Sequence, residues 1–106
     1  MLYNKEIRSR IIKKVNGIDM KILETKVEKK DNNTILLLHG FPEISYSFRH
    51  LMSLLAKSGY YCVAPDQRGY GASSKLTKAN LNEYSIINLT KDISFLLKKL
   101  CIKKFI

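Results

Sequence analysis

The residues best suited to chemistry lie where a short apolar run ends. Residues 34–38 carry four consecutive aliphatic side chains, and His39-Gly40-Phe41-Pro42-Glu43 follows directly. The run predicts a short strand buried on both faces. Gly40 can adopt backbone angles closed to other residues, and a cis bond is compatible with Phe41-Pro42. A strand that ends in such a turn places backbone N–H donors at the carboxyl edge of a parallel sheet, where open α/β sheets bind their ligands.

A second stretch with chemical potential is Pro65-Asp66-Gln67-Arg68-Gly69-Tyr70-Gly71-Ala72-Ser73-Ser74. It is predicted to be a loop that follows the strand 60–65. The Arg68 guanidinium has five donors with which to tie down loop carbonyls, so a structural role is favoured over substrate contact. No base lies beside the two serines in sequence, and we expect their hydroxyls to serve loop hydrogen bonding. The residues assigned to this structural motif are Asp66, Arg68, Gly69 and Gly71.

The ordered pair of motifs resembles the α/β-hydrolase superfamily, and most closely its epoxide hydrolases. Haloalkane dehalogenases and related esterases are near neighbours. The resemblance extends over nearly the whole chain, and it is more specific for the superfamily than for the reaction. It implies an α/β fold in which an antiparallel hairpin precedes parallel strands with crossover helices, in an incomplete sheet. Residues 1–106 would then be the N-terminal portion of the hydrolase domain, ending before the nucleophile elbow and containing no cap domain.

The resemblance also implies roles for the first motif. The backbone N–H of Phe41 would supply half of an oxyanion hole, and one such donor is worth about 3–4 kcal/mol in the transition state. Pro42 would fix the turn, His39 would buttress the loop and Gly40 would permit close approach. Phe41, Pro42 and Glu43 are also expected to line the substrate pocket. The alternative is a tight turn that only closes a strand.

By the same resemblance, a complete epoxide hydrolase works in two steps on a small-molecule substrate. An Asp carboxylate opens the epoxide while cap tyrosines donate to its oxygen, and a His–acid pair then activates water to hydrolyse the ester. The chain contains no Gly-x-Ser-x-Gly or Gly-x-Asp-x-Gly. Nucleophile, acid and His follow in that chain order, so all three are expected beyond Ile106. We therefore expect no turnover from this chain alone, and neither a cofactor nor a metal.

The elements that must position these motifs follow from local patterns. Residues 9–15 and 18–27 predict two strands joined by Asn16-Gly17, the preferred type I′ hairpin turn. Residues 46–58 predict a helix that Ser45 or Ser47 caps and Ser58-Gly59 ends. Its expected apolar face is Phe48, Leu51, Met52, Leu54 and Leu55.

A second helix is predicted from Ser85, its cap, to about Leu100. A polar connection over residues 76–83 precedes it, and a strand is expected to begin at Lys104–Ile106. Because that strand is so short, Leu36 and Leu38 should lie near an unpaired edge, and the isolated chain should fold poorly or aggregate. The expected apolar face of the helix is Ile86, Leu89, Ile93, Leu96, Leu97 and Leu100.

Composition limits the class of protein. The chain has 106 residues, of which 45% are hydrophobic and 26% charged, as in one small globular domain. The longest aliphatic run is too short to cross a bilayer. The N-terminal residues contain no apolar h-region, so we expect no secretory signal and a cytoplasmic location. Cys62 and Cys101 lack metal-ligand spacing and are expected to be small, buried or half-buried side chains.

The formal net charge of +10, from 19 basic and 9 acidic residues, raises the possibility of a nucleic-acid partner. Lysines are scattered along the chain, and aromatic residues are not interleaved with the arginines as stacking platforms. A solvated, lysine-rich surface is therefore favoured, and we expect neither a nucleic-acid nor a membrane partner. Oligomeric state stays open. The arginines are Arg8, Arg10, Arg49 and Arg68.

Other functions stay open beside the epoxide hydrolase. A serine esterase or lactonase, or a haloalkane dehalogenase, would share the fold and differ at the nucleophile. A non-catalytic binding fragment would keep the half-sheet and bind a ligand without turnover. A basic nucleic-acid binder would require tight, salt-sensitive binding.

Overall fold

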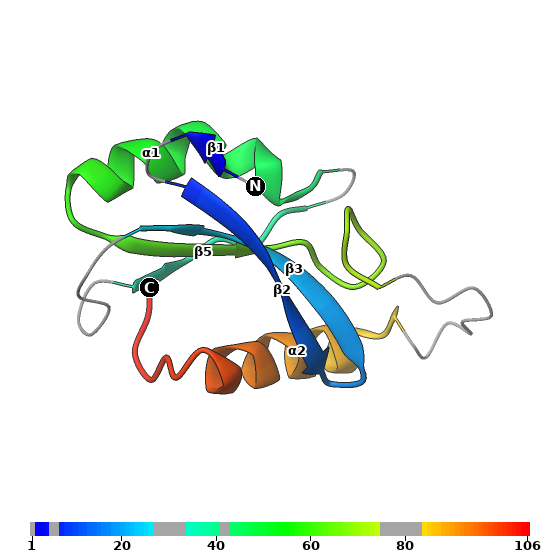
Figure 1. The fold of residues 1–106 in the computed structure, drawn as a ribbon. Helices are drawn as coiled ribbons and strands as arrows, with labels where there is room; N and C mark the ends of the chain where they lie inside the picture. The colour runs from blue at the N-terminus through cyan, green and yellow to red at the C-terminus, as the bar shows by residue number, and fades with distance from the viewer. Residues whose placement is uncertain (1, 5–6, 27–33, 41–42, 75–83) are drawn as a thin grey trace.

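A mixed β-sheet between two helices forms the body of the protein. The computed structural model describes residues 2–4, 7–26, 34–40, 43–74 and 84–106. The described residues form a five-stranded sheet in the order β1-β2-β3-β5-β4, with α1 over one face and α2 over the other (Figure 1). The elements are β1 (Leu2–Asn4), β2 (Ile7–Val15), β3 (Ile18–Thr25), β4 (Thr34–Leu36), the 3-10 helix η1 (Ser45–Phe48), α1 (Arg49–Lys57), β5 (Tyr61–Pro65) and α2 (Ile86–Lys99).

The predicted N-terminal hairpin is confirmed. Strands β2 and β3 pair antiparallel, and Asn16 and Gly17 both have positive φ, +48° and +80°, as a type I′ turn requires. The register shifts between Ile12 and Val15, which marks a bulge before the turn. Strand β1, which pairs antiparallel with β2, was not predicted, because three residues are too few to show a period. The expected end of the return strand at Val27 lies outside the described residues.

The predicted parallel pairing is present. Strands β4 and β5 run parallel, with Ile35 opposite Cys62, while β3 pairs antiparallel with β5. An α/β fold with a hairpin and a parallel pair is therefore confirmed. The expectation that residues 34–38 form a strand buried on both faces is wrong in two respects: β4 ends at Leu36, and Leu38 is 46% exposed.

The outer edge of β4 explains this exposure. β4 lies between β5 and a single residue, Ile106, rather than inside a wide parallel array. The Leu36 N–H donates to the Ile106 carbonyl at 2.8 Å, and the Ile106 N–H donates to the Thr34 carbonyl at 2.9 Å. These two bonds flank Ile35 in the manner of a parallel ladder. The strand expected at Lys104–Ile106 is thus represented by one paired residue, which accepts from the Leu36 N–H, while β4 remains the last strand of the described sheet.

Helix α1 begins differently from the prediction. The 3-10 turn η1 precedes it, and no side chain among the described residues caps either start, so the caps expected at Ser45 and Ser47 are wrong. The predicted end is confirmed, because Gly59 has φ +90° directly after the last turn. Met52 is buried, whereas Leu51 and Leu54 are exposed, since α1 meets the sheet along a narrower stripe than the apolar pattern suggested.

Helix α2 matches its prediction more closely. The Ser85 Oγ accepts from the Asn88 N–H at 3.2 Å, which confirms the cap. Leu96 and Leu97 are buried, but Ile86 is 75% exposed and does not belong to the core. The polar connection predicted for residues 76–83 falls outside the described residues. Within the described ranges, neither helix combines the length and the apolarity needed to cross a lipid bilayer.

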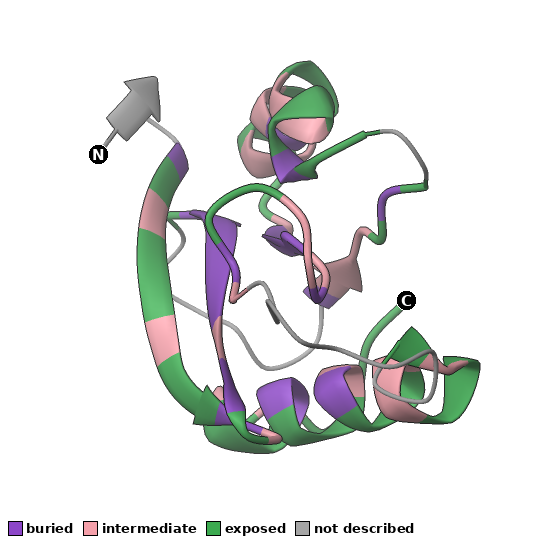
Figure 2. Cartoon of the chain, turned by 90° about the vertical axis from the view of Figure 1, so that its right-hand side faces the viewer, coloured by how far each residue is buried: buried purple, intermediate pink, exposed green. Residues whose placement is uncertain are grey.

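The core lies in two layers, one on each face of the sheet. Figure 2 shows β3 buried along almost its whole length, while most of β2 is exposed. Every residue of β5 is also buried. Cys62 is buried as predicted, and burial raises the pKa of its thiol to about 11, whereas Cys101 is exposed, contrary to prediction. The layer on the α2 side contains Val15, Ile18, Met20, Ile22, Tyr61, Val63 and Leu96; the layer on the α1 side contains Ile7, Leu23, Met52, Cys62 and Ala64.

Candidate active site

The two motifs found in the sequence lie against each other at the carboxyl ends of β4 and β5. The Gln67 N–H donates to the His39 Nε2 at 3.0 Å, and the Gln67 side-chain amide donates to the His39 carbonyl at 2.6 Å. Because Nε2 accepts a hydrogen bond, the proton of the neutral ring belongs on Nδ1, which lies 3.1 Å from the Gly40 carbonyl oxygen. One residue of the second motif therefore contacts both the side chain and the main chain of His39.

The chain turns back after Gly40 and then enters η1. The Glu43 N–H donates to the Gly40 carbonyl at 2.8 Å, and the Ser45 N–H donates to the Asp66 Oδ1 at the same distance. Gly40 and Glu43 are exposed at this turn. Phe41 and Pro42 lie outside the described residues, so their predicted roles as oxyanion donor, turn former and pocket lining stay predictions.

Asp66 is the buried centre of the loop that carries the second motif. Its Oδ2 accepts from the Ala72 N–H at 3.2 Å and lies 3.8 Å from the Lys21 Nζ. Gly71 lies so close to Asp66 that a Cβ added to it would come well within 3.0 Å of the Asp66 Oδ2. Real Cβ atoms essentially never approach another atom so closely. The Ser73 hydroxyl donates to the Asp66 carbonyl. This carboxylate is therefore surrounded by donors and leaves no room for a side chain at Gly71.

Two serines attach the loop to the sheet. The Ser73 Oγ accepts from the Lys21 N–H and the Ser74 Oγ accepts from the Asp19 N–H, each at 3.0 Å. Both hydroxyls thus serve loop hydrogen bonding, as predicted, and they hold the loop against β3.

Arg68 points away from the turn after β4 and into the protein. Its Nε and one terminal nitrogen donate to the two oxygens of Asp92 at 3.0 and 2.9 Å, in a buried bidentate pair. The same terminal nitrogen donates to the Asn16 carbonyl at 3.2 Å, and the Asn16 side chain donates to Asp92 at 2.9 Å. Arg68 thereby joins the loop to α2 and to the hairpin turn.

Sequence reasoning missed Asp92. The signal was present, because Asp92 is the only acidic residue of α2 and lies among that helix's apolar positions. A carboxylate on a buried helix face requires a cation or several donors. Nothing local in the sequence identifies Arg68 as the partner, since the two residues approach only when α2 packs on the sheet. The motif glycine Gly69 lies against the ring of Tyr84.

A second buried polar cluster lies at the other end of β3, away from the motifs. Glu24 is fully buried and accepts from Arg8 at 2.9 Å, from Arg10, and from the Tyr61 hydroxyl at 2.6 Å. Burial alone would raise the pKa of Glu24, but the hydrogen bonds from Arg10 and Tyr61 and the charges of both arginines hold it below the ordinary value. Burial, followed by the bond to Glu24, raises the pKa of Tyr61.

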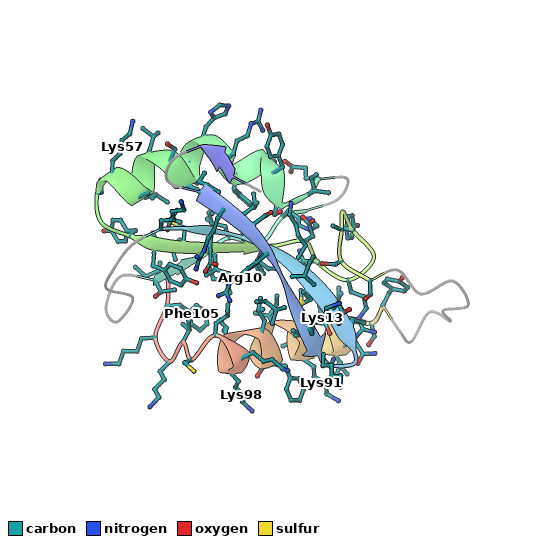
Figure 3. The ribbon with its side chains drawn as sticks, in the orientation of Figure 1. Arg10, Lys13, Lys57, Lys91, Lys98 and Phe105 are labelled. Atoms are coloured by element: carbon teal, nitrogen blue, oxygen red, sulfur yellow. The ribbon has the colours of Figure 1, made fainter. Side chains whose placement is uncertain are left out.

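Two hollows adjoin the motifs. A cavity of about 200 Å³ lies beside His39, where the Tyr70 ring meets the imidazole edge-on with a centroid distance of 4.8 Å. A larger hollow of about 510 Å³, here named the apolar groove, runs between β4 and α2. Phe105, which lies in the segment that returns from α2 toward the sheet (Figure 3), also lines it. Gln67 and Leu89 line both hollows; the apolar groove is also lined by Leu36, Leu38, Ile86, Ile93 and Leu97.

Charge is spread over the outside of the fold. Lys57, Lys91 and Lys98 project outward from the two helices in Figure 3. Among the residues that the structure describes, no three His, Cys, Asp or Glu side chains lie close enough together to hold a metal ion.

Comparison with known proteins identifies the family to which this fold and these motifs belong. The family model for the alpha/beta hydrolase fold matches residues 33–106. Epoxide hydrolase A of Mycobacterium tuberculosis is 42% identical over 82 residues, which are 77% of this chain and 24% of that protein. Epoxide hydrolase 3 of Siraitia grosvenorii is 38% identical over 89 residues, or 84% of this chain and 26% of that protein.

Solved structures agree. The epoxide hydrolase VrEH1 from Vigna radiata superposes with a TM-score of 0.81 at 39% identity, covering 95% of this chain and 31% of its own. The chain therefore belongs to the α/β-hydrolase fold family, as the two motifs predicted, and its sequence is epoxide-hydrolase-like. It spans about a quarter of the length of the curated relatives named above.

Proposed function

We propose that this chain is the N-terminal portion of an epoxide hydrolase, which adds water to an epoxide and yields a vicinal diol. The observation that carries the proposal is the junction of the two motifs, in which Gln67 binds both the ring and the carbonyl of His39. This junction lies at the carboxyl edge of a parallel pair, where open α/β sheets place ligands. Relatives at about 40% identity that bear the name epoxide hydrolase support the choice of reaction.

In the proposed reaction this chain provides positioning and one donor. The Phe41 N–H would stabilise the oxyanion that forms when water attacks the ester intermediate, and Phe41, Pro42 and Glu43 would line the substrate pocket. Nucleophile, acid and His base would come from residues outside this sequence, as would a cap. The chain alone would then give no turnover. Its cytoplasmic location and the absence of nucleic-acid or membrane partners stay predictions.

The test is a comparison of substrates with the polypeptide that the complete gene encodes. An aryl epoxide, a haloalkane and an activated ester are each incubated with the purified protein, and diol, halide and carboxylate are measured. Diol formation as the dominant activity supports the proposal. Dominant halide release or ester cleavage would replace it by the dehalogenase or the serine esterase of the same fold.

The 106-residue chain is assayed beside it. Epoxide turnover by this chain alone would show that the catalytic groups have been wrongly assigned to residues outside it. Tight ligand binding without turnover in both proteins would favour a non-catalytic binding fragment.

A further inference from the structure

Two adjacent residues of the second motif hold the two ends of the segment that contains the first. At the start, Gln67 donates from its main chain and its side chain to His39. At the end, the Asp66 Oδ1 accepts from the Ser45 N–H at 2.8 Å. Between these points, the bond from the Glu43 N–H to the Gly40 carbonyl closes the turn. Residues 66 and 67 thus bind His39 and Ser45, the described residues on the two sides of this turn.

We propose that Asp66 and Gln67 act as a two-point clamp on the segment 39–45, which positions its described residues His39-Gly40 and Glu43 to Ser45. This inference rests on the proposed function, which assigns an oxyanion donor to the turn between those residues. Such donors stabilise a transition state only when they are oriented beforehand, since a mobile donor must be ordered at the moment of reaction. Both residues act through the segment, and they are positioning residues rather than catalytic ones.

Asp66 is built to serve both loops at once. Its side chain is almost fully buried, and its two carboxylate oxygens contact different partners. Oδ1 faces Ser45 in the first loop, while Oδ2 faces Ala72 in its own loop and the Lys21 ammonium. A carboxylate can accept on both sides, whereas the amide of Asn accepts on one side only. The negative charge also strengthens the bond from the Ser45 N–H relative to a neutral acceptor.

Asp66 is itself held in place, so the clamp does not depend on a free side chain. Its main-chain N–H donates to the Lys21 carbonyl at 2.8 Å, and Ser73 bonds both the Asp66 carbonyl and the Lys21 N–H. Strand β3 therefore anchors the second loop, and the second loop anchors the first. The Arg68–Asp92 pair belongs to the same loop but leads to α2 and the hairpin turn instead.

Asp66 and the Arg68–Asp92 pair bind different parts of the protein, so matched control variants are available. Asp66→Asn removes one acceptor at the clamp, and Asp92→Asn makes the same chemical change at a buried carboxylate that does not contact the segment. Gln67→Met removes the side-chain donor to His39 at similar length. Ser74→Ala removes a hydrogen bond from the same loop to Asp19 on β3.

The readout is amide hydrogen exchange of Ser45 and Glu43 in the polypeptide that the complete gene encodes, with the melting temperature measured in parallel. Loss of a charge-assisted bond predicts at least about tenfold faster exchange at Ser45 in Asp66→Asn, and loss of a neutral one about fivefold at Glu43 in Gln67→Met. In Asp92→Asn and Ser74→Ala the two amides should change only as far as global stability changes.

The ring of His39 gives an independent signature. Its nitrogen-15 resonances should show the Nδ1–H tautomer, because Nε2 accepts from Gln67. The Nε2–H tautomer would overturn the first point of the clamp. After the change in global stability has been subtracted, equal acceleration at Ser45 in Asp66→Asn and Asp92→Asn would overturn the second point of the clamp. Unchanged exchange in both Asp66→Asn and Gln67→Met would overturn it as well.

None of these measurements uses a substrate. If the exchange results hold and the complete protein fails to open epoxides, the reaction assignment fails while the clamp persists. If the complete protein opens epoxides and the exchange results fail, the clamp alone is overturned.

Discussion

The loop cluster, formed by the described residues of 39–45 and 66–74, and the apolar groove lie next to each other and are stabilised in different ways. In the loop cluster, buried polar groups such as Asp66 and Arg68 find their partners within this chain. In the groove, apolar side chains such as Leu38 and Ile86 are exposed to solvent. The loop cluster is therefore expected to depend on individual bonds, while the groove should tolerate polar substitutions with little loss of stability.

Breaking the Arg68–Asp92 pair should give the largest effect. Arg68→Met leaves the buried Asp92 carboxylate without its bidentate partner, which should lower the free energy of unfolding by about 3–5 kcal/mol. Urea denaturation followed by circular dichroism measures the change. A loss below about 1 kcal/mol would mean that water replaces the guanidinium and that the loop cluster is looser than its bonds suggest.

Substitution of Gly71 tests how tightly Asp66 is enclosed. Gly71→Ala adds a Cβ against Asp66 Oδ2 at φ +50°, and we expect a loss of about 2–3 kcal/mol in the free energy of unfolding. Gly17→Ala is the matched control. Gly17 also has positive φ, but no atom lies within 4 Å of the position that its Cβ would occupy, so only the left-handed backbone angles should cost stability, by about 1 kcal/mol. Equal losses would show that the space beside Asp66 is not restricted.

Glu24 should dominate the acid sensitivity of the sheet. Its folded-state pKa lies below the ordinary value of 4.5, so its stabilisation is present above about pH 4.5 and is lost as the pH falls through the folded-state pKa. Glu24→Gln should cost about 1–3 kcal/mol at pH 7 and should flatten the pH dependence of stability below pH 5. Asp19→Asn, at a more exposed carboxylate, is the control. An unchanged acid limb in Glu24→Gln would assign the acid sensitivity to other carboxylates.

At alkaline pH, stability is expected to fall rather than rise as the pH increases. The folded-state pKa of Tyr61 is raised above its ordinary value of 10.0. Its contribution is therefore complete below about pH 10 and declines as the pH rises further, because the unfolded phenol ionises first. Tyr61→Phe should remove that decline.

The smallest effect on stability is expected in the groove. Leu38→Ser should change the free energy of unfolding by no more than about 0.5 kcal/mol, because Leu38 is already 46% exposed. The same substitution should weaken self-association of the chain, which exposed apolar surface beside a strand edge promotes. Sedimentation velocity over a range of concentrations measures this. A sharp, reversible, monomeric melting transition of the unchanged chain would contradict the expected association.

How much the sequence revealed depended on the range of the interactions. The Asn16-Gly17 turn, the Ser85 cap and the end of α1 at Gly59 were predicted, because each depends on a few adjacent residues. The cap at Ser45 was wrong for the opposite reason. A serine before a helix usually caps its first turn through its hydroxyl. Here Ser45 is already the first residue of η1, its main-chain N–H donates to Asp66, 21 residues later, and its buried hydroxyl has no hydrogen-bond partner among the described residues.

In the candidate site, too, local features were predicted and long-range contacts were not. Two motifs and their order were enough to predict the family, since each motif is a contiguous string whose resemblance to the family can be read from the sequence. Their joining through Asp66 and Gln67 could not be predicted, because it depends on β4 and β5 lying side by side in the correct register. Asp92 was missed because its partner lies in another element.

The sequence by itself thus determined the hairpin turn, the α2 cap, the end of α1 and the order of most strands and helices, through apolar periodicity, glycine conformations and a capping side chain that act over a few residues. Only the tertiary structure decided which buried charges meet, how far β4 is covered, and how the two loops are held together. Those outcomes arise when distant segments pack, and the free energy of a buried hydrogen bond or ion pair depends on the position of both partners.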